Sequence, residues 1–436
     1  MSFMDKFQAG IEKVLVPIAT KLNAQRHICA VRDAFILTFP LTMAGSLMIL
    51  LNFVLLSPDG FIAKIFKLGE IFPNLADYQA IFSPVLKGSV DILAILIVFL
   101  VARNLARLMK ADDLLTGLTA ISVFFIIYPD YVALEGANHL ATKYMGAQGL
   151  FVAIIVGLLV GELMSRLSRT SKLEIKMPPQ VPPAVSKAFS AIIPAAIVFT
   201  VFGIIAAIFL VGVGTPVKEF INQTIQRPLT SLGQSPVTII VLTLVSQLLW
   251  FFGLHGSNIV GPVLDTLYSP ALQANSEAIL IHNTEPIHAI TRNIIDIYGM
   301  HGGSGSTLGL VIALMIFSKR QEHKELTKLV LAPSVFQINE PVIYGLPIVL
   351  DPIFCIPFIL VPTISVFIGW FFTAIVPIAG YVYIAQPWVT PPVISAFVAT
   401  GGSIGATVIA ACTFIFSIIA YAPFVMLANK QRVEEQ

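Results

Sequence analysis

The chain has 436 residues, of which 56% are hydrophobic and only 11% charged, and its formal net charge at pH 7 is +2. Its mean hydropathy of +0.87 excludes an ordinary soluble globular domain and predicts a polytopic membrane protein. The basic residues form short separate clusters, which excludes a continuous nucleic-acid-binding face, and about 20 residues per span leave room for about ten crossings.

The N-terminal segment carries Asp5 and Lys6 before any long apolar run, unlike a cleavable signal peptide. Its apolar residues recur at helical spacing from Phe3 to Ile18. This pattern predicts an amphipathic helix that lies on the membrane surface.

Charge-poor runs long enough to cross a membrane follow in chain order. The first half has five, at residues 34–57, 81–102, 114–134, 145–161 and 188–214. The second half has four, at residues 233–254, 298–317, 353–380 and 396–428, with two ambiguous apolar stretches at 256–284 and 329–350. These runs predict an all-α fold.

The basic clusters give the orientation of the spans. They lie at the N-terminus and at residues 103–110, 166–176, 319–328 and 430–432. If all of them are cytoplasmic, one further crossing must lie between residues 255 and 297, and 329–350 must begin and end on the same side. The count therefore predicts ten crossings, cytoplasmic termini and a re-entrant hairpin at 329–350.

Within that hairpin, residues 335–345 read VFQINEPVIYG. Backbone interrupted by proline cannot face lipid, and broken segments are where transporters place their substrate sites. A carboxylate at mid-bilayer costs about 2.5 to 3.5 kcal/mol, so Glu340 is expected to face a cavity or a partner. Two interpretations stay open: Glu340 caps backbone or pairs with a base, or it binds a polar substrate or moves a proton.

A second motif, QLLWFFGLHGSN, covers residues 247–258. Gln247, Trp250 and His255 recur at helical spacing, so an amide, an indole and an imidazole can share one face. His255 is either a satisfied interfacial histidine or, with the glycine-containing turn up to Asn258, part of a binding site.

A third motif, AQPWVTPP at residues 385–392, is rigid and uncharged, so it can fold back into the bilayer. Trp388 belongs either to an aromatic belt at the interface or to a stacking platform for a sugar ring. A carboxylate, amides, an imidazole and indoles with little positive charge suit a neutral polyhydroxylated ligand.

Two further features lie near these motifs. Residues 301–306 read HGGSGS, which indicates close helix packing through small residues or backbone contact with the ligand. A nucleotide-binding loop is excluded because no strand precedes these residues and no lysine follows them. Arg292 and Asp296, four residues apart, are assigned to a first hairpin or a gate.

The motifs INEPVIYGLP, LHG, HGGSGSTLG and PWVTPP, with PLTMAGS and the terminal YAPFVMLANK, resemble enzyme IIC of the lactose/cellobiose/diacetylchitobiose branch of the sugar phosphotransferase system (PTS). The similarity runs nearly end to end. It implies about ten transmembrane helices plus two re-entrant hairpins, in a multi-pass protein of the bacterial inner membrane with cytoplasmic termini. Residues 1–230 would form a homodimer and carry cytoplasmic amphipathic segments, and residues 231–436 would hold the sugar.

The resemblance implies a sugar permease, in which a β-linked disaccharide enters and is phosphorylated on its 6-hydroxyl from the cytoplasmic side. Cellobiose-type sugars are favoured, with diacetylchitobiose and lactose as alternatives. Glu340 and His255 match the family's catalytic positions, Glu340 to bind the hydroxyl and draw its proton, and His255 to orient the sugar. The resemblance and the neighbouring motif residues place the sugar against Trp388, Gln337, Asn339, Trp250, Asn258 and Gln247.

The phosphoryl donor is expected to be a phosphocysteine, which needs an exposed polar setting. Cys29, Cys355 and Cys412 lie in or beside apolar segments, so the donor is expected on a separate enzyme IIB that docks on the stretches 103–110 and 319–328. The chain is thus expected to be the membrane component of a phosphotransferase, with no metal and no cofactor of its own. The alternative is an ion-coupled secondary sugar transporter in which Glu340 carries the coupling proton.

Overall fold

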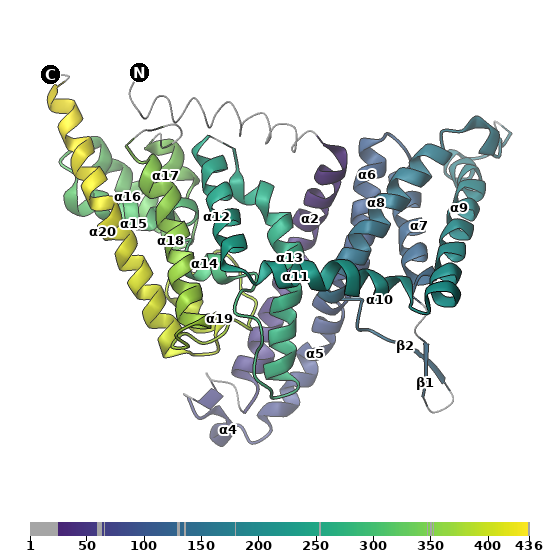
Figure 1. The fold of residues 1–436 in the computed structure, drawn as a ribbon, viewed down its shortest axis with the longest axis horizontal. Coiled ribbons are helices and arrows are strands. Elements are labelled where there is room, and N and C mark those ends of the chain that lie inside the picture. The colour runs from purple at the N-terminus through teal and green to yellow at the C-terminus, as the bar shows by residue number, and fades with distance from the viewer. Residues whose placement is uncertain are drawn as a thin grey trace. The chain divides into compact units, whose positions relative to one another are not determined.

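The computed structural model describes residues 25–58, 63–64, 66–128, 131–134, 137–178, 180–252, 254–346, 348, 351 and 353–434. The chain divides into two compact units. Figure 1 labels the helices and strands of the chain. The N-terminal unit contains residues 22–45 and 85–229, and the C-terminal unit contains residues 46–84 and 230–436. Residues 46–84 thus cluster with residues 230–436, whereas the sequence analysis places them in the half 1–230. The dimerisation role of residues 1–230 and the sugar-binding role of residues 231–436 stay predictions.

The N-terminal unit consists mainly of long apolar helices. Its elements are α2 (Arg26–Ile49), whose last residues belong to the other unit, and α6 (Leu93–Leu108), α7 (Asp113–Ile126), β1 (Tyr131–Leu134), β2 (Ala137–Leu140), α8 (Leu150–Leu167), α9 (Pro183–Ala207) and α10 (Val217–Ile221). Helix α5 (Gln79–Lys87) has its first six residues in the C-terminal unit and its last three in this one. Helix α11 (Arg227–Gly233) leads into the C-terminal unit.

The predicted span 114–134 is too long at its end. Helix α7 begins after Asp112, whose side chain accepts a hydrogen bond from the backbone N–H of Leu115, as an N-cap aspartate does. It ends at Ile126, and β1 and β2 then form an antiparallel pair with Tyr131 opposite Leu140. A short apolar strand cannot be separated from the end of a span by hydropathy alone.

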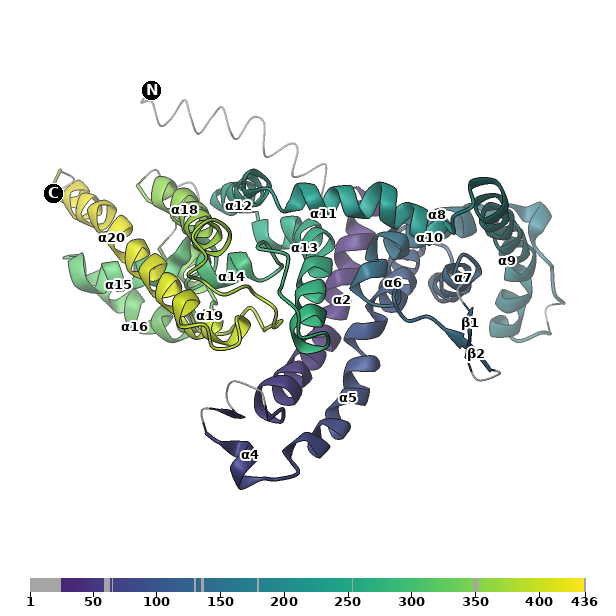
Figure 2. The same cartoon turned by 60° about the horizontal axis from the view of Figure 1, so that its bottom comes forward.

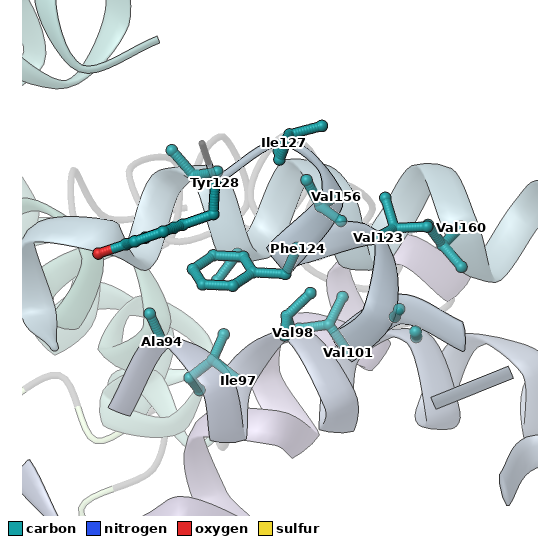
Figure 3. Close-up of a cluster of buried hydrophobic side chains, with 14 of the residues drawn as sticks. Ala94, Ile97, Val98, Val101, Val123, Phe124, Ile127, Tyr128, Val156 and Val160 are labelled. Carbon is teal, nitrogen blue, oxygen red and sulfur yellow. The ribbon is translucent and has the colours of Figure 1, made fainter. Parts of the chain in front are cut away.

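The core of the N-terminal unit lies where α6, α7 and α8 pack together. A Cβ atom at Gly157 of α8 would lie 2.9 Å from the Cβ of Val101 on α6, and one at Gly161 would lie 3.0 Å from Leu105. Small residues therefore let the two backbones approach closely, as is common between membrane helices. Figure 3 shows Phe124 of α7 beside Ile97 and Val98 of α6 in this apolar core.

The C-terminal unit contains the broken helices. Its elements are α4 (Leu68–Ile71), α12 (Pro236–Phe251), α13 (Gly256–Leu280), α14 (Ile294–Tyr298), α15 (Thr307–Phe317), α16 (Gln321–Val335), α17 (Glu340–Gly345), α18 (Cys355–Ala374), α19 (Ile394–Ala399) and α20 (Ile404–Glu434). Figure 2 shows α15 beside both α16 and α20, which it contacts.

Several helices are long and apolar enough to cross a membrane. Five helical runs in the described residues meet both criteria, namely Leu75–Leu108, Ala147–Leu167, Pro183–Val213, Cys355–Ala374 and Ile404–Asn429. Val217–Gly233 with Pro236–Phe251 adds a sixth if the bent pair is one span, and α7 and Ser304–Phe317 are shorter apolar helices. Helix α13, with 25 residues, occupies the region where the charge pattern requires an additional crossing. The helix count agrees roughly with the ten that the sequence predicts.

Two predicted segments differ from the structure in detail. Residues 396–428 are two helices, because the chain turns between α19 and α20, where Gly401 and Gly402 adopt positive φ. Residues 329–350 contain the end of α16 and the short α17. The predicted amphipathic helix at residues 3–18 lies outside the described residues.

Candidate functional site

A loop rich in glycine and serine, residues 301–306 between α14 and α15, lies at the centre of the polar groups of the C-terminal unit. We call it the glycine loop. Gly303 and Gly305 have φ of 91° and 77°. A Cβ at Gly303 would lie 2.6 Å from the carbonyl oxygen of Gln337, and one at Gly305 would lie 2.3 Å from the ring of Phe358. Only glycine satisfies both the backbone conformation and the space at these positions.

Two buried glutamines hold the backbone of the glycine loop. The side-chain oxygen of Gln337 accepts hydrogen bonds from the N–H groups of Gly302 (2.6 Å) and Gly303 (2.8 Å). The side-chain oxygen of Gln247 on α12 accepts one from Gly305 (2.8 Å). The glutamines are 3% and 0% exposed. They thus satisfy backbone donors that cannot reach water in the interior.

Further contacts tie the loop to α20 and to the start of α13. The hydroxyl of Tyr421 on α20 donates to the carbonyl oxygen of Gly305 (2.6 Å). The hydroxyls of Ser304 and Ser257 are 3.1 Å apart, and the indole N–H of Trp250 donates to Ser257 (3.2 Å). Elements far apart in sequence therefore meet at one short loop.

Helix α17 begins against the same loop. The side-chain amide of Asn339, the residue before α17, donates to the carbonyl oxygen of Ser304 (3.4 Å). Pro341 occupies the first turn of α17, where a missing backbone N–H costs no hydrogen bond. This arrangement fixes where the side chain of Glu340 leaves the backbone.

His255 and Glu340 form the accessible part of the cluster. Nε2 of His255 lies 3.6 Å from Oε1 of Glu340, and the two side chains are 41% and 42% exposed. Nδ1 of His255 accepts from the N–H of Asn258 (3.3 Å), which places the proton of a neutral ring on Nε2, towards Glu340. The imidazole also stands against the indole of Trp250, with the ring centroids 4.2 Å apart.

The loop of residues 385–392, which we call the proline loop, is attached at two points. The side-chain amide of Asn293 donates to the carbonyl oxygen of Gln386 (3.2 Å), and that of Gln337 donates to the carbonyl oxygen of Thr390 (3.2 Å). Trp388, between them, is 43% exposed. Gln337 thus bridges the glycine loop and the proline loop.

A charged cluster holds the chain just before α14. The guanidinium of Arg292 contacts the carboxylates of Asp265 on α13 and, at 3.5 Å, Asp296 on α14. Asn293, which donates to Asp296 (3.2 Å), uses the same amide to hold Gln386. The Arg292–Asp296 spacing in the sequence indicates this pair, but the sequence gives no sign that Asp265 joins it.

Hydrogen bonds at residues outside the predicted spans hold the start of α16 in place. The hydroxyl of Ser318 lies 2.9 Å from Nδ1 of His323, and Asn429 of α20 accepts from the N–H of Lys319 (3.0 Å). Burial lowers the pKa of His323, Arg320 lowers it further, and Glu322 raises it. His323 is therefore favoured as a neutral ring, and α16, which leads to Glu340, is anchored to α15 and α20.

The predicted site residues thus have different surroundings. The structure brings His255, Glu340 and Trp250 into contact and places Gln337, Asn339 and Gln247 on the glycine loop. Asn258 is exposed, and its backbone N–H contacts His255. Trp388 is connected to the group through Thr390. Whether these residues bind a ligand stays a prediction.

Sequence reasoning missed Tyr421, Asn293 and Gln386. Tyr421 and Gln386 both lie in the stretch without Asp, Glu, Lys or Arg between residues 352 and 429. A polar side chain in such an apolar stretch is the one sequence signal that could have indicated them as functional residues. No group of three or more His, Cys, Asp or Glu residues that could hold a metal ion occurs within the described ranges.

Comparison with known proteins places the chain in a family. The model of the family "Phosphotransferase system, EIIC" matches residues 32–362. The chain is 33% identical to the PTS system cellobiose-specific EIIC component of Lactococcus lactis, covering 98% of this chain and 99% of that protein. It is 34% identical to the lichenan permease IIC component of Bacillus subtilis, covering 99% and 96% of the two chains.

A solved structure gives the same result. The transporter ChbC, the IIC component of the N,N'-diacetylchitobiose-specific phosphotransferase system, is 30% identical and superposes with a TM-score of 0.89 over 98% of both chains. The family and the apolar helices establish a multi-pass membrane protein. The chain belongs to the EIIC family of the phosphotransferase system.

Proposed function

We propose that this chain is the sugar-specific permease of a phosphotransferase system and that it translocates a β-linked disaccharide, preferably of the cellobiose type. The preference is supported by the relatives named for cellobiose and lichenan. The observation that carries the proposal is the accessible His255–Glu340 pair beside otherwise buried amides. These groups suit a ligand rich in hydroxyls and without net charge.

The sugar-binding part of the proposal depends on two kinds of group. Trp388 exposes an indole that can stack on the apolar face of a pyranose ring. Glu340 and His255 supply an acceptor and a donor for hydroxyls. The buried Gln247 and Gln337 hold the loops on which these groups depend.

The His255–Glu340 pair also suits the transfer step. Because Nε2 and Oε1 are 3.6 Å apart, one hydroxyl oxygen can lie within hydrogen-bond reach of both atoms. Glu340 then accepts the hydroxyl proton as the sugar oxygen attacks the phosphorus, and the cysteine thiolate of the donor leaves. His255 donates to the same oxygen and orients it. Phosphoryl transfer needs this positioning more than covalent help from the protein.

The donor is proposed to be a phosphocysteine on a separate enzyme IIB. Cys29 and Cys355 are buried, and Cys412, although exposed, lies within the apolar run of α20. Docking on the basic stretch 319–328 is supported because α16 runs from there to the turn that carries Glu340. In the other proposed stretch, Arg103 and Arg107 both pair with Asp113.

Homodimerisation and cytoplasmic termini belong to the same proposal. The basic clusters support the orientation by the positive-inside rule. The run Pro183–Val213 supports an interface in the N-terminal unit, because little of this apolar run is buried within the chain. Cross-linking of single-cysteine variants on α9 in membranes tests the dimer, and a dimer linked elsewhere contradicts this interface.

The function is tested with membrane vesicles that contain the chain. Cellobiose, other β-glucosides, lactose and diacetylchitobiose are supplied with a phosphorylated IIB, or with a proton or sodium gradient alone. We expect sugar phosphate to appear inside only when phosphorylated IIB is present. Accumulation of unmodified sugar driven by an ion gradient would instead establish a secondary transporter.

A further inference from the structure

One glutamine of the proline loop stands apart from the other polar residues of the C-terminal unit. Gln386 is 2% exposed, yet neither its side-chain oxygen nor its side-chain nitrogen has a hydrogen-bond partner in the part of the chain that the structure describes. A buried amide without partners costs about 1 to 3 kcal/mol for each unsatisfied group. The amide of Gln386 therefore costs stability unless another group binds it.

Two equally buried glutamines provide the contrast. Gln247 and Gln337 use their amide oxygens on backbone N–H groups of the glycine loop, and Gln337 also donates to Thr390. Their amides are committed to holding the fold. Gln386 has the same side chain and the same burial, but its amide is not used in this way.

The backbone around Gln386 is held in place. Asn293 donates to its carbonyl oxygen, and Asn293 in turn is bound to Asp296 of the charged cluster. Four residues later, Gln337 holds the carbonyl oxygen of Thr390. With both attachments in place, the loop presents Gln386 at a fixed position two residues from Trp388.

We propose that Gln386 is a sugar-binding residue whose side-chain amide hydrogen-bonds hydroxyls of the disaccharide next to the ring that stacks on Trp388. The inference rests on the proposed function. A primary amide offers one acceptor oxygen and two donor hydrogens, which match two neighbouring hydroxyls of a pyranose. The preference for hydroxyls at those positions makes Gln386 a specificity-determining residue, because a sugar that lacks them leaves the amide unpaired.

The test is Gln386→Leu in the purified full-length chain, with cellobiose as the probe, or whichever β-disaccharide the wild type binds. We expect sugar affinity to fall by about 10- to 100-fold, as for the loss of one or two hydrogen bonds to a buried amide. The melting temperature without sugar is expected to stay the same or to rise, because an unpaired polar group is removed. In phosphorylation assays the KM rises and the rate at saturating sugar is retained.

Gln337→Leu is the matched comparison. It leaves the N–H groups of Gly302 and Gly303 unpaired, so it is expected to lower the melting temperature without sugar. If Gln386→Leu lowers the melting temperature to a similar extent, the amide of Gln386 has a structural partner and the proposal is wrong. Unchanged sugar affinity in Gln386→Leu also overturns it.

Deoxy sugars identify the contact itself. Monodeoxy derivatives of the bound disaccharide are titrated against the wild type and against Gln386→Leu. Removal of at least one hydroxyl is expected to weaken binding to the wild type and to cause no such loss in Gln386→Leu. Equal effects of every hydroxyl in both proteins contradict the proposal. A wild type that binds no disaccharide contradicts the proposed function, whereas wild-type binding that Gln386→Leu leaves intact contradicts only this inference.

Discussion

In the N-terminal unit, α6 and α8 meet through glycines against apolar side chains, whereas in the C-terminal unit the helices meet around a loop that buried amides hold. Gly157 lies against Val101, and nearby residues of α6, α7 and α8 form one apolar core (Figure 3). Gly303 lies against Gln337 and Asn339, and its N–H is bound by a side chain. Glycine permits close approach in both units, but Gly157 meets mainly hydrocarbon and Gly303 meets polar groups.

This difference shows how a membrane protein can keep polar backbone inside. Continuous helices satisfy their own amides, so α6 and α8 need only shape complementarity. The glycine loop is not continuous helix, so Gln247, Gln337 and Tyr421 must supply its missing hydrogen bonds. His255 and Glu340 take no part in these hydrogen bonds with the glycine loop, and their side chains stay accessible.

The largest effect is expected at the accessible pair. Glu340→Gln removes the proton acceptor but keeps the shape, so the rate of sugar phosphorylation at saturating sugar should fall about 10²- to 10⁴-fold. Sugar affinity should fall much less, since an amide still hydrogen-bonds. Equal losses of affinity and rate would show that Glu340 is a ligand contact only. Glu70→Gln, at an exposed position on α4, is the control and should change neither.

The next effect concerns the buried amides of the C-terminal unit. Gln337→Leu should lower the free energy of unfolding by about 3 kcal/mol, because it leaves two buried backbone N–H groups unpaired. It should also weaken sugar binding by releasing Thr390 of the proline loop. Thermal unfolding in detergent and sugar titration measure the two effects. A variant as stable as the wild type would show that water replaces the amide.

In the N-terminal unit, Gly157→Leu should lower the free energy of unfolding by about 2 kcal/mol, since the new side chain collides with α6. Gly69→Leu on α4 is the control, because its added Cβ would lie 3.8 Å from the nearest atom, an ordinary contact distance. Sugar affinity of the protein that folds should be unchanged in both. A loss of affinity in Gly157→Leu would contradict the division of roles between the units.

Trp388→Ala tests the exposed surface of the C-terminal site. It should weaken sugar binding by about 3- to 15-fold, the value of one aromatic stacking contact, and leave the melting temperature close to that of the wild type. Trp388→Phe keeps an aromatic plane, so its sugar affinity should lie between those of the wild type and Trp388→Ala. Titration calorimetry gives the affinities, and identical affinities in all three proteins would remove Trp388 from the site.

The smallest effect is a pH dependence at the anchor of α16. Because the pKa of His323 lies below its ordinary value of 6.5, the neutral ring stabilises the fold above that pH, and this stabilisation is lost as the pH falls below it. The melting temperature should therefore drop between pH 7.5 and 5.5, and the drop should be smaller in His323→Asn. Equal drops would assign the dependence to other groups.

Much of the architecture could be predicted from the sequence because hydropathy and the basic clusters report directly on spans. The motifs at 247–258, 335–345 and 385–392 also indicated the residues that the structure connects. The hydrogen-bond partners could not be predicted, because Gln247, Gln337 and Gln386 look alike in sequence and differ only in what the fold places beside them. The strand at 131–134 was missed for a similar reason, since its apolar residues continue the pattern of α7.

The most direct test of the account is the tryptophan fluorescence of Trp370→Phe, which keeps Trp250 and Trp388, two of the three tryptophans. If the sugar stacks on the proline loop beside the His255–Glu340 pair, the emission should change with added disaccharide and saturate at the concentration that saturates binding. Trp370→Phe/Trp388→Phe should lose the part of this response that comes from Trp388, at sugar concentrations that still saturate binding. An equal response in both proteins would place the sugar elsewhere and contradict the account.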